Sequence, residues 1–112
     1  MIPMAKKLTY SVLIIDNFHL HDEEEHYTID GFPTKELAIE FARRWVRDSL
    51  EEMRDPTKTK EEIKNYWLAF GEDAMVIDGG YRGKSELDFF IDNPAIPEEI
   101  NWKEIKRIAG ID

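Results

Sequence analysis

The segment TKELAIEFARRWVRDSLEEMR, residues 34–54, is the strongest secondary-structure signal in the sequence. Its apolar residues recur every three or four positions, which places them on one face of a long helix. They are Leu37, Phe41, Ala42, Trp45, Val46, Leu50 and Met53. Pro33 and Thr34 are typical of a helix start, and Asp55-Pro56 ends the pattern. The stripe is therefore predicted to pack on the core, with Trp45 at its centre.

The opposite face of this helix carries arginines. Arg43, Arg44 and Arg47 alternate with acidic residues, as in the pair Glu40 and Arg44, four positions apart. Such pairs stabilise a helix by about 0.2–0.5 kcal/mol each. We therefore expect a solvent-exposed face with salt bridges, and not a phosphate-binding stripe.

Four short segments are predicted to be strands. Residues 8–18 are apolar on both faces, which favours a central strand. Residues 26–29 alternate before a turn at Asp30-Gly31 and form a hairpin with the first strand. Residues 74–77 and 87–91 are joined by the glycine-containing stretch 78–85, which predicts a second hairpin.

Two further helices have clear start signals. Thr59 and Glu62 form a capping box before residues 60–70, and Asn101 caps residues 102–109. The face of the first of these helices that carries Ile63, Tyr66, Trp67 and Phe70 is predicted to pack on the core. The chain is therefore predicted to be one α+β domain, residues 1–112. Its elements follow the order β-β-α-α-β-β-α, with an antiparallel sheet of about four strands and the helices on one face. A three-stranded sheet is the alternative.

Charge and composition exclude several classes of function. The 112 residues include 24 Asp and Glu but only 15 Lys and Arg, a net charge of −9, and there is no Cys. A negative field repels phosphate backbones and favours a basic partner, so we expect no nucleic-acid binding. The lack of Cys excludes disulfides and thiolate metal sites. We expect no cofactor.

Membrane insertion is not expected either. The sequence has no apolar stretch of 18 residues and no short apolar run behind a basic N-terminus. We therefore expect a cytoplasmic protein that does not contact a membrane.

The segment HLHDEEEH, residues 19–26, gathers all three histidines beside four consecutive carboxylates. Imidazole and carboxylate groups bind Zn, Mn, Fe or Ni. The candidate ligands are His19, His21, His26 and Glu24, and they would make the protein a metal-binding protein or a metal-assisted hydrolase. The spacing matches no established metal motif, and a solvated acidic loop is the competing interpretation.

Acid–base catalysis is a further alternative, because several carboxylates follow or lie on predicted strands. They are Asp16, Asp30, Glu72, Asp73, Asp78 and Asp88. General acid–base chemistry needs a sheltered pair of such groups. Their spacing singles out no pair, so we favour a protein that is not an enzyme.

Thirteen aromatic residues supply candidate contacts for a protein partner. Phe18, Phe32 and Tyr81 lie near predicted loops. Phe89 and Phe90 are adjacent on a predicted strand, so only one of them can face the helices, and we take Phe90 as the partner contact. Rigid aromatic side chains dominate interface energetics. An apolar second face of the sheet, formed by Val12 and Ile14 or by Leu13 and Ile15 together with Val76 and Phe90, also predicts a homodimer.

Several short motifs follow one another in the first part of the chain: Asp16-Asn17-Phe18-His19, Asp22–Glu25, Tyr27, Gly31-Phe32, Glu36-Leu37-Ala38 and Phe70–Asp73. Together they resemble a group of short uncharacterised bacterial proteins over about residues 10–77. The resemblance implies a bacterial, cytoplasmic protein with a strand, an acidic turn and a helix in this order. It carries no catalytic or binding residue. From the residues themselves we infer a small acidic, non-catalytic interaction or assembly module, one version of which binds a basic partner.

Overall fold

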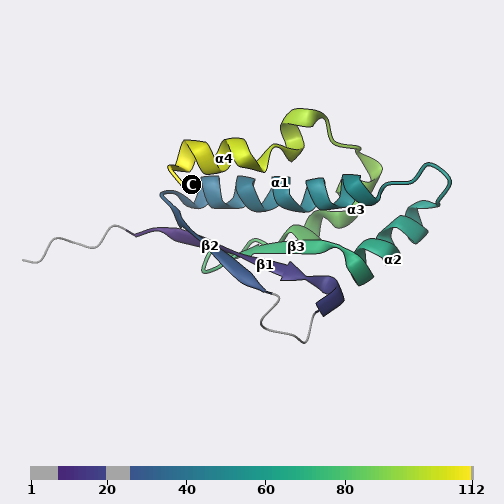
Figure 1. Cartoon of the computed structure of the whole chain (residues 1–112), viewed down its shortest axis with the longest axis horizontal. Helices are drawn as coiled ribbons and strands as arrows, with labels where there is room; N and C mark the ends of the chain where they lie inside the picture. Colours follow the sequence, from purple (N-terminus) through teal and green to yellow (C-terminus); the bar gives the residue numbers. More distant parts are fainter. Residues whose placement is uncertain (1–7, 20–25, 112) are drawn as a thin grey trace, which may run out of the picture.

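The computed structural model describes residues 8–19 and 26–111, which form a three-stranded antiparallel sheet with helices on one side (Figure 1). The first half contains β1 (Tyr10–Asp16), the 3-10 turn η1 (Asn17–His19), β2 (Tyr27–Phe32) and α1 (Lys35–Met53). The second half contains α2 (Lys60–Phe70), β3 (Glu72–Val76), η3 (Gly83–Glu86), α3 (Leu87–Asp92), η4 (Pro97–Ile100) and α4 (Trp102–Ala109). The predicted α+β class and antiparallel sheet are confirmed.

The sheet has the order β2-β1-β3, so the strand that is apolar on both faces is central, as predicted. Val12 lies opposite Ile29 on β2 and Val76 on β3, and the β1–β2 register shifts between Tyr10 and Val12. Ser11, at this irregularity, donates a hydrogen bond to Asp30 (2.6 Å).

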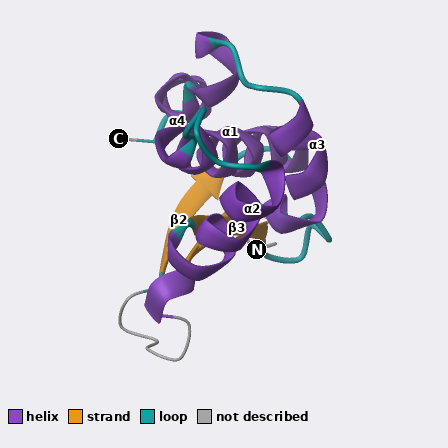
Figure 2. Cartoon of the chain, turned by 90° about the vertical axis from the view of Figure 1, so that its right-hand side faces the viewer, coloured by secondary structure: helices purple, strands orange, loops and turns teal. Residues whose placement is uncertain are grey.

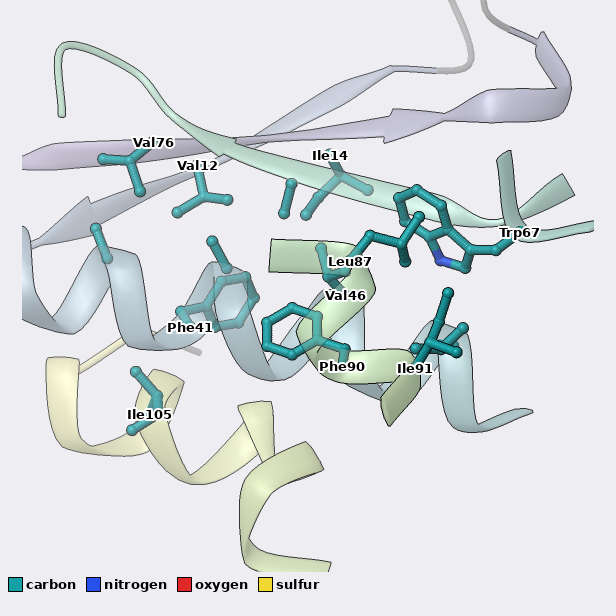
Figure 3. Close-up of a cluster of buried hydrophobic side chains, with 14 of the residues drawn as sticks. Val12, Ile14, Phe41, Val46, Trp67, Val76, Leu87, Phe90, Ile91 and Ile105 are labelled. Carbon is teal, nitrogen blue, oxygen red and sulfur yellow. The ribbon is translucent and has the colours of Figure 1, made fainter. Parts of the chain in front are cut away.

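The core lies between the sheet and α1, and α4 packs on the side of α1 that faces away from the sheet (Figure 1). Val12, Ile14 and Val76 point from the strands toward Phe41 and Val46 of α1 (Figure 3). Trp45 is only partly buried, so the predicted centre of the α1 stripe is wrong. The fully buried residues of this helix are Ala38, Phe41, Ala42, Val46 and Leu50.

The predicted fourth strand, residues 87–91, is instead the helix α3, so the order is β-β-α-α-β-α-α. Leu87, Phe90 and Ile91 are buried, whereas Phe89 is 58% exposed. Burial at positions i, i+3 and i+4 is the helical pattern. Arg54 stabilises the C-terminal end of α3 by donating hydrogen bonds to the carbonyl oxygens of Phe90 (3.0 Å) and Ile91 (3.1 Å).

The predicted second hairpin is thereby reduced to one bridge, between Met75 and Arg82. The connecting turn contains Gly80 at φ 71°. Gly83 then lies so close to α1 that a Cβ there would be 2.3 Å from a methyl carbon of Val46. The fully buried Asp73 accepts hydrogen bonds from the Arg82 side chain (2.6 Å) and the Lys84 backbone (3.0 Å), which holds the returning chain against β3.

The arginine face of α1 is not the predicted solvent-exposed face, because the C-terminal third packs against it. Arg43 pairs with Glu86 (2.9 Å), and Arg44 pairs with Glu104 (2.9 Å). Arg47 is 6% exposed. These arginines tie α1 to distant parts of the chain, in addition to the predicted pairing of Arg44 with Glu40 (2.8 Å).

None of the helices in the described ranges is both long and apolar enough to cross a lipid bilayer.

Candidate functional site

Three exposed aromatic rings are in contact at one end of the sheet, and we call Phe18, Tyr66 and Phe70 the aromatic cluster. The ring centroids of Phe18 and Phe70 are 5.3 Å apart in a stacked arrangement, and those of Tyr66 and Phe70 are 5.0 Å apart. The three residues remain 60%, 54% and 47% exposed, respectively. Exposed aromatic side chains in mutual contact are a feature of interaction surfaces.

The positions of these rings follow from how α2 and η1 are held. The predicted capping box of Thr59 and Glu62 fixes the start of α2, and Ile63 and Trp67 bury its inner face. Tyr66 and Phe70 therefore lie on the outer side. The η1 turn is fastened to the end of α2 by Asn17, whose backbone N–H donates to Gly71 O (3.0 Å) and whose amide donates to Trp67 O (3.1 Å).

η1 and α2 consequently meet at the same end of the sheet, which Figure 2 shows from that side.

A pocket of about 260 Å³ lies next to the aromatic cluster, and Phe70 belongs to both. We call it the carboxylate–tryptophan pocket. Its lining residues come from α1, α2, β3 and α4 and are Trp45, Asp48, Ser49, Glu52, Met53, Phe70, Glu72 and Trp102. The Trp45 and Trp102 ring centroids are 4.6 Å apart. The pocket thus combines carboxylates with aromatic walls.

Indole and hydroxyl groups fix the polar side chains of this pocket. Trp45 Nε1 donates to Glu72 Oε1 (3.0 Å), and Trp102 Nε1 donates to Asp48 Oδ2 (2.9 Å). Ser49 Oγ accepts from the backbone N–H of Glu72 (2.9 Å) and from Trp67 Nε1 (3.2 Å). The two carboxylates are therefore held in place by side chains that are themselves packed.

The pocket has a surplus of negative charge. Burial raises the pKa of Glu72, and the negative charges of Asp16, Glu52 and Asp48 raise it further, against the lowering effect of the hydrogen bond from Trp45. Within the described residues, no Lys or Arg forms a salt bridge with Glu72, Asp48 or Glu52. The described part of the chain therefore supplies no cation that balances the negative charge of the pocket.

Replacing Glu72 with glutamine is expected to increase thermal stability at pH 7. A raised pKa in the folded state means that folding disfavours the ionised form, so the penalty is present above that pKa and vanishes as pH falls below the ordinary carboxylate range. The amide oxygen of Gln can still accept from Trp45. We expect the melting temperature of Glu72→Gln to exceed that of the wild type at pH 7 and to approach it at about pH 3, below the ordinary Glu pKa. An equal or lower melting temperature at pH 7 would contradict the charge surplus.

A wider groove continues from the pocket between the end of α1 and α2. It has a volume of about 910 Å³, and it shares Glu52, Met53 and Phe70 with the carboxylate–tryptophan pocket. Tyr66 also lines this groove, with the acidic Asp55 and Glu62 and the basic Arg54 and Lys58. The aromatic cluster, the pocket and the groove therefore form one continuous surface, which we call the acidic aromatic surface.

Of the four predicted metal ligands, His19 and His26 lie in the described residues, and His21 and Glu24 lie outside them. The ring Nδ1 of His19 is 2.9 Å from Asp16 Oδ2, and Nδ1 of His26 accepts from the Asp16 backbone N–H (3.2 Å). Burial alone would raise the pKa of Asp16, but hydrogen bonds from His19 and from the Phe18 backbone N–H lower it overall.

Within residues 8–19 and 26–111, no group of three or more His, Asp or Glu side chains is arranged to hold a metal ion.

The predicted partner-binding aromatic residues differ in how far they are exposed. Phe18 is exposed in the aromatic cluster. Phe32 and Phe90 are 0% and 1% exposed, so these two predictions are wrong, because both rings complete the core. Tyr81 is partly buried, with Arg43 over its ring at 5.3 Å and its hydroxyl donating to Glu86.

Tyr66 and Phe70 are exposed, so their predicted place on the inner face of α2 is wrong. Ile63, Tyr66, Trp67 and Phe70 lie at positions i, i+3, i+4 and i+7, which form one stripe about 100° wide. The spacing therefore gave no signal that only Ile63 and Trp67 are buried.

The second face of the sheet carries one of the two predicted pairs of apolar residues. Val12, Ile14 and Val76 all point into the core, which leaves Leu13, Ile15 and Met75 on the outer side. The register places Leu13 next to the polar Thr28, and Ser11 pairs with Asp30 on the same side. Apolar and polar residues therefore share this face, and the homodimer stays a prediction.

Comparison of the chain with protein-family models, curated proteins and solved structures gave no match with any of the three.

Proposed function

We propose that this protein is a small non-catalytic interaction module that binds a basic segment of a partner protein on the acidic aromatic surface. The observation that carries the proposal is the juxtaposition of three exposed rings in contact with one another and carboxylates that have no cationic partner among the described residues. Phe18, Tyr66 and Phe70 lie outside the buried core of the described residues.

The aromatic cluster supports the proposal through its rigidity. Phe18 is fixed by the two hydrogen bonds of Asn17, and Phe70 is at the end of a capped helix. Rings that are already ordered lose little conformational freedom on binding, which is why aromatic residues are frequent among energetically dominant interface residues. A partner that covers these rings would remove a large apolar area from water.

Charge supports the choice of a basic partner. The whole chain carries −9, and the aromatic cluster adjoins Glu52 and Glu72. Charge complementarity accelerates association and disfavours partners of the same sign. An acidic or nucleic-acid partner would meet repulsion at this surface.

Selection from a random peptide library displayed on phage tests the proposal. We expect enriched peptides to combine Lys or Arg with an apolar residue. The double variant Phe18→Ala/Phe70→Ala should weaken their binding at least about 30-fold, the effect of losing an interface residue worth about 2 kcal/mol. Isothermal titration calorimetry measures the change.

Phe89→Ala is the matched control, because Phe89 is an equally exposed phenylalanine on α3, outside the surface. It should leave peptide affinity unchanged. Enrichment of acidic peptides, or equal losses in the control and the double variant, would contradict the proposed function.

A second copy of the chain is the other candidate partner, favoured by one observation. A groove of about 420 Å³ on α4 is lined by Lys103, Lys106 and Arg107 together with Trp102. Trp102 also lines the carboxylate–tryptophan pocket. Neighbouring surfaces of opposite charge can pair around a two-fold axis. Sedimentation velocity separates the candidates, since a self-associating chain sediments as twice 13.2 kDa and Lys103→Glu would then dissociate it.

A further inference from the structure

The carboxylate–tryptophan pocket has the size and chemistry of a receptor for one cationic side chain. We propose that it holds the terminal ammonium or guanidinium group of a Lys or Arg residue of the partner, while the aromatic cluster contacts the apolar residues beside it. This inference rests on the proposed function and names the feature of the partner that the pocket would recognise.

In the described part of the chain, the carboxylate oxygen atoms of the pocket outnumber the hydrogen bonds that reach them. In the described part of the chain, hydrogen bonds engage Oε1 of Glu72 and Oδ2 of Asp48, both from indole N–H groups. Oε2 of Glu72, Oδ1 of Asp48 and the Glu52 carboxylate have no hydrogen bond there. Ammonium and guanidinium groups carry three and five N–H donors, so they match several acceptors around one space.

The arrangement favours an organic cation over a metal ion. No three carboxylate or imidazole groups among the described residues converge closely enough to hold a metal. Instead, Asp48 and Glu72 line an open space of about 260 Å³ whose other walls include Trp45, Trp102 and Met53. Aromatic and thioether side chains suit the aliphatic stem and the charged end of a Lys or Arg residue.

Helix ends add to the negative potential. α2 ends at Phe70 on the wall of the pocket, and its last turn contains no basic residue. The last turn of α1, which supplies Glu52 and Met53, also contains none, and its C-cap Arg54 pairs with Glu51. The C-terminal end of a helix carries a partial negative charge that favours cations. The raised pKa of Glu72 agrees with a site that lacks a positive charge.

The three indole N–H signals provide a direct test by two-dimensional ¹H–¹⁵N NMR of the full chain. Trp45 and Trp102 line the pocket, whereas Trp67 is fully buried and donates to Ser49, so it serves as the internal control. The probes are the tripeptides acetyl-Gly-Lys-Gly-amide and acetyl-Gly-Arg-Gly-amide, with the uncharged norleucine analogue as reference. We expect saturable shifts of the Trp45 and Trp102 signals with the Lys or Arg probe in the millimolar range, and none with norleucine.

Charge-removing variants sharpen the test. Glu52→Gln and Asp48→Asn should each weaken probe binding about three- to five-fold, the effect of one partly exposed ion pair. Glu52 makes no hydrogen bond in the described part of the chain, so its replacement leaves the fold intact. Glu61→Gln removes the same charge from an exposed position of α2 outside the pocket and should have no effect.

Equal shifts with norleucine, no indole shift with either cation, or equal losses in Glu61→Gln and Glu52→Gln would overturn the inference. The proposed function is tested separately. Library peptides that lose affinity in Phe18→Ala/Phe70→Ala but not in Glu52→Gln would retain the aromatic interaction surface and reject the cation pocket.

Discussion

Replacing Trp67 with alanine is expected to lower the free energy of unfolding by about 3–5 kcal/mol, the usual cost of truncating a large buried aromatic residue. Trp67 is completely buried between α2 and the sheet, and it is the largest side chain of the core (Figure 3). Truncation would also remove the donor to Ser49. A domain of this size has a total stability of about 5–15 kcal/mol, so the variant is expected to lose a large part of it.

Urea unfolding monitored by circular dichroism measures the effect. Tyr66→Ala is the control, because Tyr66 precedes Trp67 in α2 but is 54% exposed, and its replacement should change stability by no more than about 0.5 kcal/mol. Similar losses in the two variants would show that α2 does not pack through Trp67.

Replacing Arg47 with alanine is expected to cost about 3 kcal/mol, because hydrogen bonds from a charged donor contribute about 1.5–3 kcal/mol each. Arg47 donates to Asn93 O (2.7 Å) and to Glu99 (3.3 Å), and its guanidinium lies 4.9 Å from the Phe90 ring centroid. Its Nε has no partner within the described residues. The remaining contacts join α1 to the chain that connects α3 with η4.

One further variant separates the contribution of the Arg47 charge to stability from that of its aliphatic stem, and a second is an exposed control. Arg47→Met keeps the apolar contacts with Phe90, so it should be less destabilising than Arg47→Ala. Arg107→Ala, at a side chain that is 78% exposed, should leave stability nearly unchanged. If Arg47→Ala unfolds at the same urea concentration as Arg107→Ala, the C-terminal third is not held through Arg47.

Local signals in the sequence predicted the elements that depend on local interactions. The stripe of α1, the capping box at Thr59 and the Asn101 cap are confirmed, because helical spacing and capping act within a few residues. The strand prediction at 87–91 is wrong for a related reason. Adjacent apolar residues in a run of five fit a buried strand and a short helix equally well, and tertiary contacts with Arg54 and α1 select the helix.

The candidate site was less accessible to sequence reasoning. Phe18 was predicted as a surface aromatic, but its contact with Phe70 joins residues 52 positions apart through the bonds of Asn17. The pocket likewise depends on hydrogen bonds from Trp45 to Glu72 and from Trp102 to Asp48, across 27 and 54 positions. No spacing rule in one sequence connects such residues.

The hydroxyl of Ser49 has a consequence for the thermodynamics of recognition. One oxygen accepts from the buried Trp67 and from the backbone that carries Glu72, so it fastens three separate elements at a single point. This side of the proposed cation pocket is thereby ordered in the free protein. The entropic cost of complex formation would consequently fall mainly on the incoming peptide, and a conformationally restrained ligand should bind more tightly than a flexible one of the same composition.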